Sequence, residues 1–107
     1  MSDDGHEVRE AFEDLLDDPD EPIHPVGVVA ELLGVDAQVV RGYDQRGLVT
    51  PGRSSSGHRR YSRRDIRRLT RAMRLAEEGI PASGIERILA LEDELGRIER
   101  DATADRS

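Results

Sequence analysis

The sequence predicts a mostly helical domain that carries one small β-hairpin. Three observations predict it: two short amphipathic stretches separated by a turn, a segment rich in proline, glycine and serine between two strand-like pieces, and a longer run with apolar residues at helical spacing. At 107 residues, with 36% hydrophobic and 3% aromatic residues, the chain has material for one small, aliphatic core.

Two short helices open the structured part of the chain, which we expect to begin near Pro25. The first helix lies in the stretch VGVVAELLGV, with Pro25 at its first helical position and Gly34 at its end. Its apolar face consists of Val26, Val29, Ala30 and Leu33. Asp36 is a suitable N-cap for the second helix, AQVVRGYDQR, which Gly47 closes. Two helices joined by about three residues make a helix-turn-helix.

The next segment predicts the β-hairpin, or wing. In LVTPGRSSSGHRRYS, the strand-like pieces 48–50 and 58–61 flank a tip of proline, glycine and serine. Ser62 then caps a third helix, and its spacing to Asp65 fits a capping box. This third helix has an apolar stripe, formed by Ile66, Leu69, Met73 and Ala76. The whole pattern is that of a winged helix-turn-helix.

A short C-terminal helix is expected over residues 81–100, after Gly79 and Pro81 end the third helix. Its apolar residues are Ile85, Ile88, Leu91, Leu95 and Ile98. The last four follow coiled-coil spacing for about two heptads, and Gly96 interrupts them. Two interpretations stay open: a short dimerisation coil, or packing back on the third helix.

Charge and composition divide the chain further. Residues 1–21 carry a charge of −9, residues 22–75 carry +7 and residues 76–107 carry −5, within a net charge of −7. We therefore expect an acidic, flexible tail over residues 1–24, a head over residues 25–80, the C-terminal helix, and a flexible tail over residues 101–107.

The basic block gathers on the third helix, on the side away from its apolar stripe. The arginines concerned are Arg63, Arg64, Arg67, Arg68, Arg71 and Arg74. Like charges four residues apart destabilise a helix by a few tenths of a kcal/mol per pair, roughly 0.2–0.5. Since Asp65 is the one acid nearby, the block favours a polyanion such as DNA as its partner. The rival partner is the acidic block at residues 1–21.

Several classes of protein are excluded by what the sequence lacks. The absence of cysteine removes disulfides, thiolate metal sites and thiol catalysis. No secretory signal or membrane span is visible, so we expect a soluble, cytoplasmic and nucleoid-associated protein. No nucleophile–base couple, paired buried acids or glycine-rich phosphate loop is apparent, so we expect neither an enzyme nor a cofactor. No other metal-ligating residues stand near His58 at the spacing of a metal site, which argues against metal binding there.

Four elements stand in a recognisable order: Arg41-Gly-Tyr43, Gly47-Leu48, Pro51-x-Arg53 and Arg59-Arg60-Tyr61. With them, residues 25–91 resemble the DNA-binding head of the MerR family of bacterial transcription regulators. The stretches AQVVRGYDQRGLV, RRYSRRDIRRL and EEGIPASGIERILALE are most similar to its heat-shock repressor branch, HspR.

The resemblance implies DNA-binding residues at named positions. The second helix would enter the major groove, where Gln38 suits adenine and Arg41 suits guanine. Tyr43 matches a tyrosine that faces the phosphate backbone. The wing and the start of the third helix supply the other residues that the motif places near DNA: Arg53, His58, Arg59, Arg60, Tyr61 and Arg63. As alternatives, Tyr43 and Tyr61 could pack in the core, and Arg41 could pair with Asp44.

The resemblance also implies a function. It is that of a sequence-specific transcription regulator, a repressor of chaperone and heat-shock genes that acts on an inverted-repeat operator. Its partners would be double-stranded DNA, the DnaK chaperone as co-repressor, and a second copy that could join only on DNA and is held through Ile88, Leu91, Leu95 and Ile98. No effector-binding domain is expected after the last helix. The alternative is a MerR-like protein-interaction module, such as a modulator of a co-chaperone; the complete wing argues against it.

Overall fold

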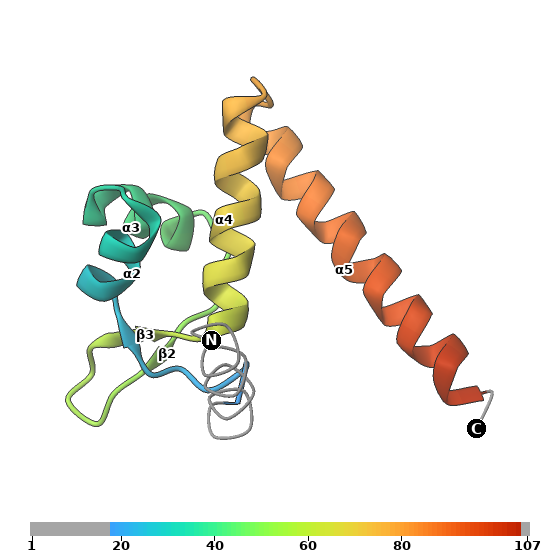
Figure 1. The fold of residues 1–107 in the computed structure, drawn as a ribbon, viewed down its shortest axis with the longest axis horizontal. Helices are drawn as coiled ribbons and strands as arrows, with labels where there is room; N and C mark the ends of the chain where they lie inside the picture. Colours follow the sequence, from blue (N-terminus) through green and yellow to red (C-terminus); the bar gives the residue numbers. More distant parts are fainter. Residues whose placement is uncertain (1–17, 106–107) are drawn as a thin grey trace, which may run out of the picture.

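The computed structural model describes residues 18–105, which fold into a helical head with a small sheet and a protruding C-terminal helix (Figure 1). The elements in chain order are β1 (His24–Pro25), α2 (Val26–Leu33), α3 (Ala37–Gln45), β2 (Gly52–Arg53), β3 (Arg59–Tyr61), α4 (Arg63–Glu77) and α5 (Ala82–Asp105). Of the acidic tail expected over residues 1–24, residues 1–17 lie outside the described residues.

Helices α2 and α3 form the predicted helix-turn-helix, and local capping explains where each begins and ends. Gly34 closes α2 with a φ of 69°, a left-handed conformation that favours glycine. The Asp36 carboxylate accepts a hydrogen bond of 3.0 Å from the Gln38 backbone N–H and so caps α3. Both predicted caps are confirmed. Pro25 is the N-cap of α2 instead of its first helical residue, because its backbone continues β1 in an extended conformation.

The sheet has three antiparallel strands in the order β1-β3-β2 within the described residues. Residue 24 pairs with residue 61, and residue 52 with residue 60. The predicted strand at residues 48–50 is wrong, since pairing starts only at Gly52. In a strand with one side in solvent, consecutive side chains alternate between buried and exposed. Leu48 and Val49 are instead both buried, each in a different core cluster. Strand β1 was not predicted, and it places residue 24 in the head instead of the tail.

The core consists of two clusters that meet at α4. The first joins α2, α3, β3 and α4 through Val29, Ala30, Val40, Val49, Tyr61 and Leu69. The second joins α4 to α5 through Leu48, Ala72, Leu75, Ile85 and Leu89. Helix α4 starts at the predicted capping box: Ser62 Oγ accepts from the Asp65 N–H at 3.0 Å, and Asp65 Oδ2 accepts from the Ser62 N–H at 2.9 Å.

Helix α5 leaves the head after its first turns (Figure 1). Its start is buried, but Leu91, Leu95 and Ile98 are 61%, 59% and 51% exposed. Packing of the whole stripe back on α4 is therefore wrong, because the two helices diverge. The helix also continues through residues 101–105, which were expected to be a tail. There Arg97 pairs with Asp101 at 3.6 Å, and Thr103 Oγ1 donates to the Glu99 carbonyl at 2.9 Å.

In the part of the chain that the structure describes, no helix is both long and apolar enough to cross a bilayer.

Candidate nucleic-acid interface

The exposed side of α3 carries polar side chains that no core contact constrains. Gln38, Arg41 and Gln45 are exposed, whereas Val40 on the other side of the helix is 1% exposed. Among residues 18–105, no carboxylate forms an ion pair with Arg41, so its predicted pairing with Asp44 is wrong. These side chains are therefore available to a ligand that approaches α3.

The wing has a tip whose shape is fixed by its own hydrogen bonds. Arg53 Nη1 donates to the Gly57 carbonyl at 3.0 Å, and the Ser54 N–H donates to the His58 carbonyl at 2.8 Å. Gly57 takes a φ of 86°, which a residue with a Cβ would rarely adopt. His58 Nδ1 lies 3.0 Å from Ser56 Oγ. The wing thus presents its cations without needing a ligand to order it.

A groove of about 410 Å³ runs between α3 and the wing. It brings together three arginines and a histidine from the two elements, namely Arg41, His58, Arg59 and Arg60. With Tyr61, five of the residues singled out in the sequence therefore line one concave surface. The groove also contains Asp44, which the sequence did not single out as functional.

Asp44 connects α3 to β3. Its side chain is 6% exposed, and its Oδ2 accepts a hydrogen bond of 2.8 Å from the Tyr61 hydroxyl. The same oxygen lies 3.2 Å from Arg59 Nε. Desolvation on burial, followed by the bond to Asp44, raises the pKa of Tyr61 to about 12. The network fixes the wing relative to the exposed side of α3.

The two motif tyrosines take different positions. Tyr61 is 0% exposed, which confirms the alternative that it packs in the core. The prediction that it contacts DNA is wrong, because the ring is buried and its hydroxyl donates to Asp44. Tyr43 is half-buried and packs against both core clusters. Its contact with phosphate stays a prediction. Arg63 is the first residue of α4, immediately beyond the wing, and is half-buried.

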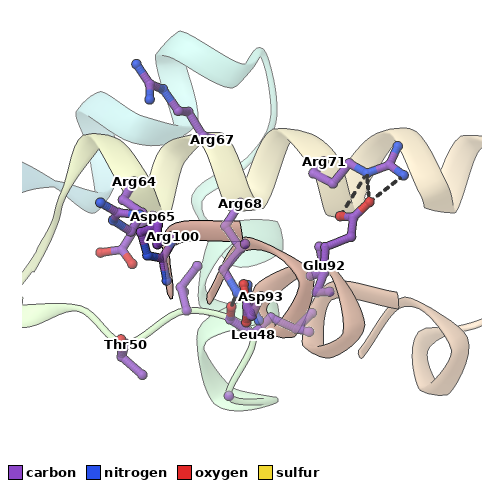
Figure 2. Close-up of a pocket in the computed structure, with 14 residues that line it drawn as sticks. Leu48, Thr50, Arg64, Asp65, Arg67, Arg68, Arg71, Glu92, Asp93 and Arg100 are labelled. Carbon is purple, nitrogen blue, oxygen red and sulfur yellow. Dashed lines mark hydrogen bonds and ion pairs between the residues drawn. The ribbon is translucent and has the colours of Figure 1, made fainter. Parts of the chain in front are cut away.

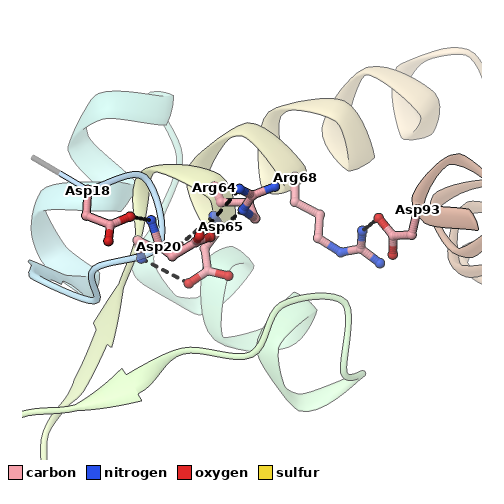
Figure 3. A network of polar contacts seen from close by, with 7 residues as sticks. Asp18, Asp20, Arg64, Asp65, Arg68 and Asp93 are labelled. Atoms are coloured by element: carbon pink, nitrogen blue, oxygen red, sulfur yellow. Dashed lines mark hydrogen bonds and ion pairs between the residues drawn. The ribbon is translucent and has the colours of Figure 1, made fainter. Parts of the chain in front are cut away.

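The arginines of α4 are less available than the sequence indicated. Arg64 pairs with Asp20, and Arg68 Nη1 pairs with Asp93 at 2.6 Å (Figure 3). Arg71 Nη2 pairs with Glu92 at 2.9 Å (Figure 2). The Arg68 Nε also donates to the Leu48 carbonyl.

These pairs correct the expectation that the arginine block needs a polyanion. Acids far away in the sequence neutralise three of its members, and one of those acids, Asp20, belongs to the rival acidic block. The cationic surface that stays open therefore lies mainly on α3 and the wing.

Replacing Tyr61 with phenylalanine should change how stability depends on alkaline pH. In the native protein the unfolded chain loses the tyrosine proton from about pH 10, while the folded chain keeps it to about pH 12. The free energy of unfolding should therefore fall as pH rises through this window, by up to about 3 kcal/mol. Below it the contribution of Tyr61 is fully present.

Urea unfolding followed by circular dichroism at about pH 9 and about pH 12 would measure this dependence. Tyr61→Phe should lack that part of the alkaline loss. It should also be less stable at pH 9 by about 1–3 kcal/mol, because Asp44 loses a donor. An equal alkaline loss in both proteins would mean that another group causes it.

Comparisons with known proteins agree with this geometry. A model of the MerR HTH family regulatory proteins matches residues 25–92. A Streptomyces coelicolor protein with the name heat shock protein HspR is 40% identical over 84 residues, which are 78% of this chain and 56% of that protein. The HTH-type transcriptional regulator TnrA of Bacillus subtilis is 36% identical over 66 residues, 62% of this chain and 60% of TnrA. The chain thus spans somewhat more than half the length of these relatives.

Solved structures give the same result. HiNmlR, a MerR family regulator that lacks the sensor domain and is bound to promoter DNA, superposes with a TM-score of 0.61 at 25% identity, over 78% of this chain and 70% of that one. The HTH-type transcriptional regulator SkgA from Caulobacter crescentus superposes with a TM-score of 0.56 at 27% identity, over 78% and 66%.

Proposed function

Because this chain belongs to the MerR family of HTH regulatory proteins, we propose that it is a sequence-specific DNA-binding transcription regulator. The observation that carries the proposal is the groove between α3 and the wing, where Arg41, His58 and two wing arginines line one surface. A helix in the major groove reads base edges, and phosphate contacts beside it set its register. HiNmlR, a protein of similar fold, is bound to promoter DNA in its solved structure.

In this proposal each element has its own task. Gln38 and Arg41, exposed on α3, read adenine and guanine in the major groove. The cations around and after the wing, Arg53, His58, Arg59, Arg60 and Arg63, bind the flanking phosphates, with Tyr43 as a further phosphate contact. Asp44 and Tyr61 act behind this surface and hold the wing against α3.

A second copy of the chain is the proposed partner on DNA. Leu91, Leu95 and Ile98 form an exposed stripe on α5, and a stripe of large apolar side chains commonly marks an interface. Ile88 packs against the second core cluster, so it supports the base of α5 more than it faces a partner. A two-fold pair of heads would match an inverted-repeat operator.

The more specific role is repression of chaperone and heat-shock genes, with the DnaK chaperone as co-repressor. It is supported by the 40% identity to the protein named HspR. The other relatives named here are transcription regulators too, which favours a non-enzymatic role. The competing function is a MerR-like module that binds proteins.

Fluorescence anisotropy on the full chain tests the proposal. Duplexes from its own promoter and from nearby chaperone promoters are compared with scrambled duplexes, with and without DnaK. A preference of about a thousandfold or more is expected for a specific site, and DnaK should strengthen it. Equal, weak and salt-sensitive binding to all duplexes would contradict a role at these promoters and favour the protein-binding module.

A further inference from the structure

Helices α4 and α5 face each other across a groove of about 640 Å³, which residues 47–50 line on a third side (Figure 2). Near the connection between the helices, acids of α5 cross to arginines of α4. Glu92 lies 2.9 Å from Arg71, and Asp93 lies 2.6 Å from Arg68. At this end, the positive charge of α4 is neutralised from α5.

One turn farther along, the charge pattern changes. Here α4 lines the groove with Arg64, Asp65 and Arg67, while α5 contributes Gly96 and Arg100 and no acid. Arg100 folds back along α5, since a Cβ added to Gly96 would lie 3.3 Å from its Nη1. Across residues 18–105, no carboxylate pairs with Arg100. This open end of the groove, defined by Arg64 and Arg100, therefore has three lining arginines and one lining carboxylate, that of Asp65 in the α4 capping box.

The acid missing from α5 comes from the N-terminal side of the chain. Asp20 pairs with the Arg64 side chain, and the Pro19 carbonyl accepts a hydrogen bond of 3.0 Å from the Arg64 N–H (Figure 3). The Asp18 carboxylate in turn accepts from the Asp20 N–H at 2.9 Å. The open end thus already holds an acidic stretch of the same chain by its side chain and its backbone.

The chain that precedes this contact is strongly acidic. Residues 1–17, which lie outside the described residues, contain seven acids and a single arginine. They are joined directly to Asp18, two residues before the Asp20 that pairs with Arg64 of the groove, and a short tether gives a local concentration in the millimolar range, on the order of 1 mM. Opposite charges attract within a Debye length of about 8 Å at physiological salt.

We propose that the open end of the α4–α5 groove binds the acidic residues 3–17 of the same chain, with Arg64 and Arg100 as the cations that hold it. The Asp20–Arg64 pair, three residues after this segment, holds the chain at the groove where the segment would dock. The proposal does not depend on DNA binding and is tested without DNA.

Paramagnetic relaxation provides the test, because the chain has no cysteine and Ala11→Cys creates a unique labelling site. A spin label at position 11 of the full chain should remove most of the amide signal of Thr50, Arg64 and Gly96. Gly34 and Val35, in the turn between α2 and α3, should keep theirs. About 1 M salt, where the Debye length is about 3 Å, should restore the lost signals.

Two pairs of substitutions locate the contact. Arg64→Ala with Arg100→Ala should abolish the broadening, whereas Arg74→Ala with Arg97→Ala should retain it; both remove two exposed arginines, and the second pair does not line the groove. Unaffected groove amides in the labelled protein, or equal loss of broadening in both variants, would overturn the proposal. So would broadening that arises only between labelled and unlabelled molecules in a mixture, since the occupant would then be a second copy.

Discussion

Leu91→Asp combined with Leu95→Asp is expected to convert the proposed dimer into a monomer and to weaken binding to an inverted-repeat operator by about a hundredfold or more. Both side chains are more than half exposed on α5, so each can be buried only by a partner. Burying a leucine contributes about 1.5–3 kcal/mol, and a two-fold interface would use each residue twice. The monomer should keep its fold, because neither side chain belongs to a core cluster.

Sedimentation equilibrium and anisotropy on the same samples would measure both effects. Ala90→Asp with Ala104→Asp is the matched control, since it adds the same charge to exposed positions of α5 that lie outside the spacing of the stripe. The control should stay dimeric. A double leucine variant that still dimerises would show that α5 does not form the interface.

Arg41→Ala is expected to reduce discrimination between operator and scrambled duplex by about 5- to 150-fold. This range corresponds to about 1–3 kcal/mol for a bidentate contact to guanine. Arg41 is suited to this contact because it is exposed on α3, and within residues 18–105 no acid neutralises it.

Arg53→Ala is the informative comparison, because Arg53 is exposed on the wing and is proposed to bind phosphate. It should weaken operator and scrambled duplex by similar factors and lower the slope of log K against log salt by about 0.9. Anisotropy titrations at several salt concentrations separate the two behaviours. If both variants lost discrimination equally, base reading could not be assigned to α3.

The predictions for Tyr61, for the stripe on α5 and for Arg41 depend on features of the fold. The sequence specified some of these features more fully than others. The ends of α2, α3 and α4 were predictable because capping is local: Gly34, Asp36 and the Ser62–Asp65 pair act on backbone groups no more than four residues away. The helix-turn-helix and the wing followed from these signals. Strand β1 did not, since two residues are too few to show alternation.

The partners of charged groups were decided only by the tertiary structure. The arginine block looked unneutralised because its acids stand 44, 25 and 21 positions away, at Asp20, Asp93 and Glu92. For Asp44 the sequence offered Arg41 on the same helix as an alternative partner, while in the fold Asp44 accepts from Tyr61, 17 positions farther on. Side-chain pairing between distant segments has no periodic signature, so a sequence shows the charges without showing which of them meet.

The sequence by itself therefore determined the fold, the family motif and the residues that could face DNA, because these depend on local capping, on hydrophobic period and on motif spacing. Only the tertiary structure decided that Tyr61 is a core residue and that Leu91, Leu95 and Ile98 are exposed while Ile88 packs inside. The first part of the apolar stripe on α5 packs in the core, and the later part is exposed. The stripe changes from core to surface where α5 diverges from α4. That point is set by three-dimensional packing, which the spacing of apolar residues does not encode.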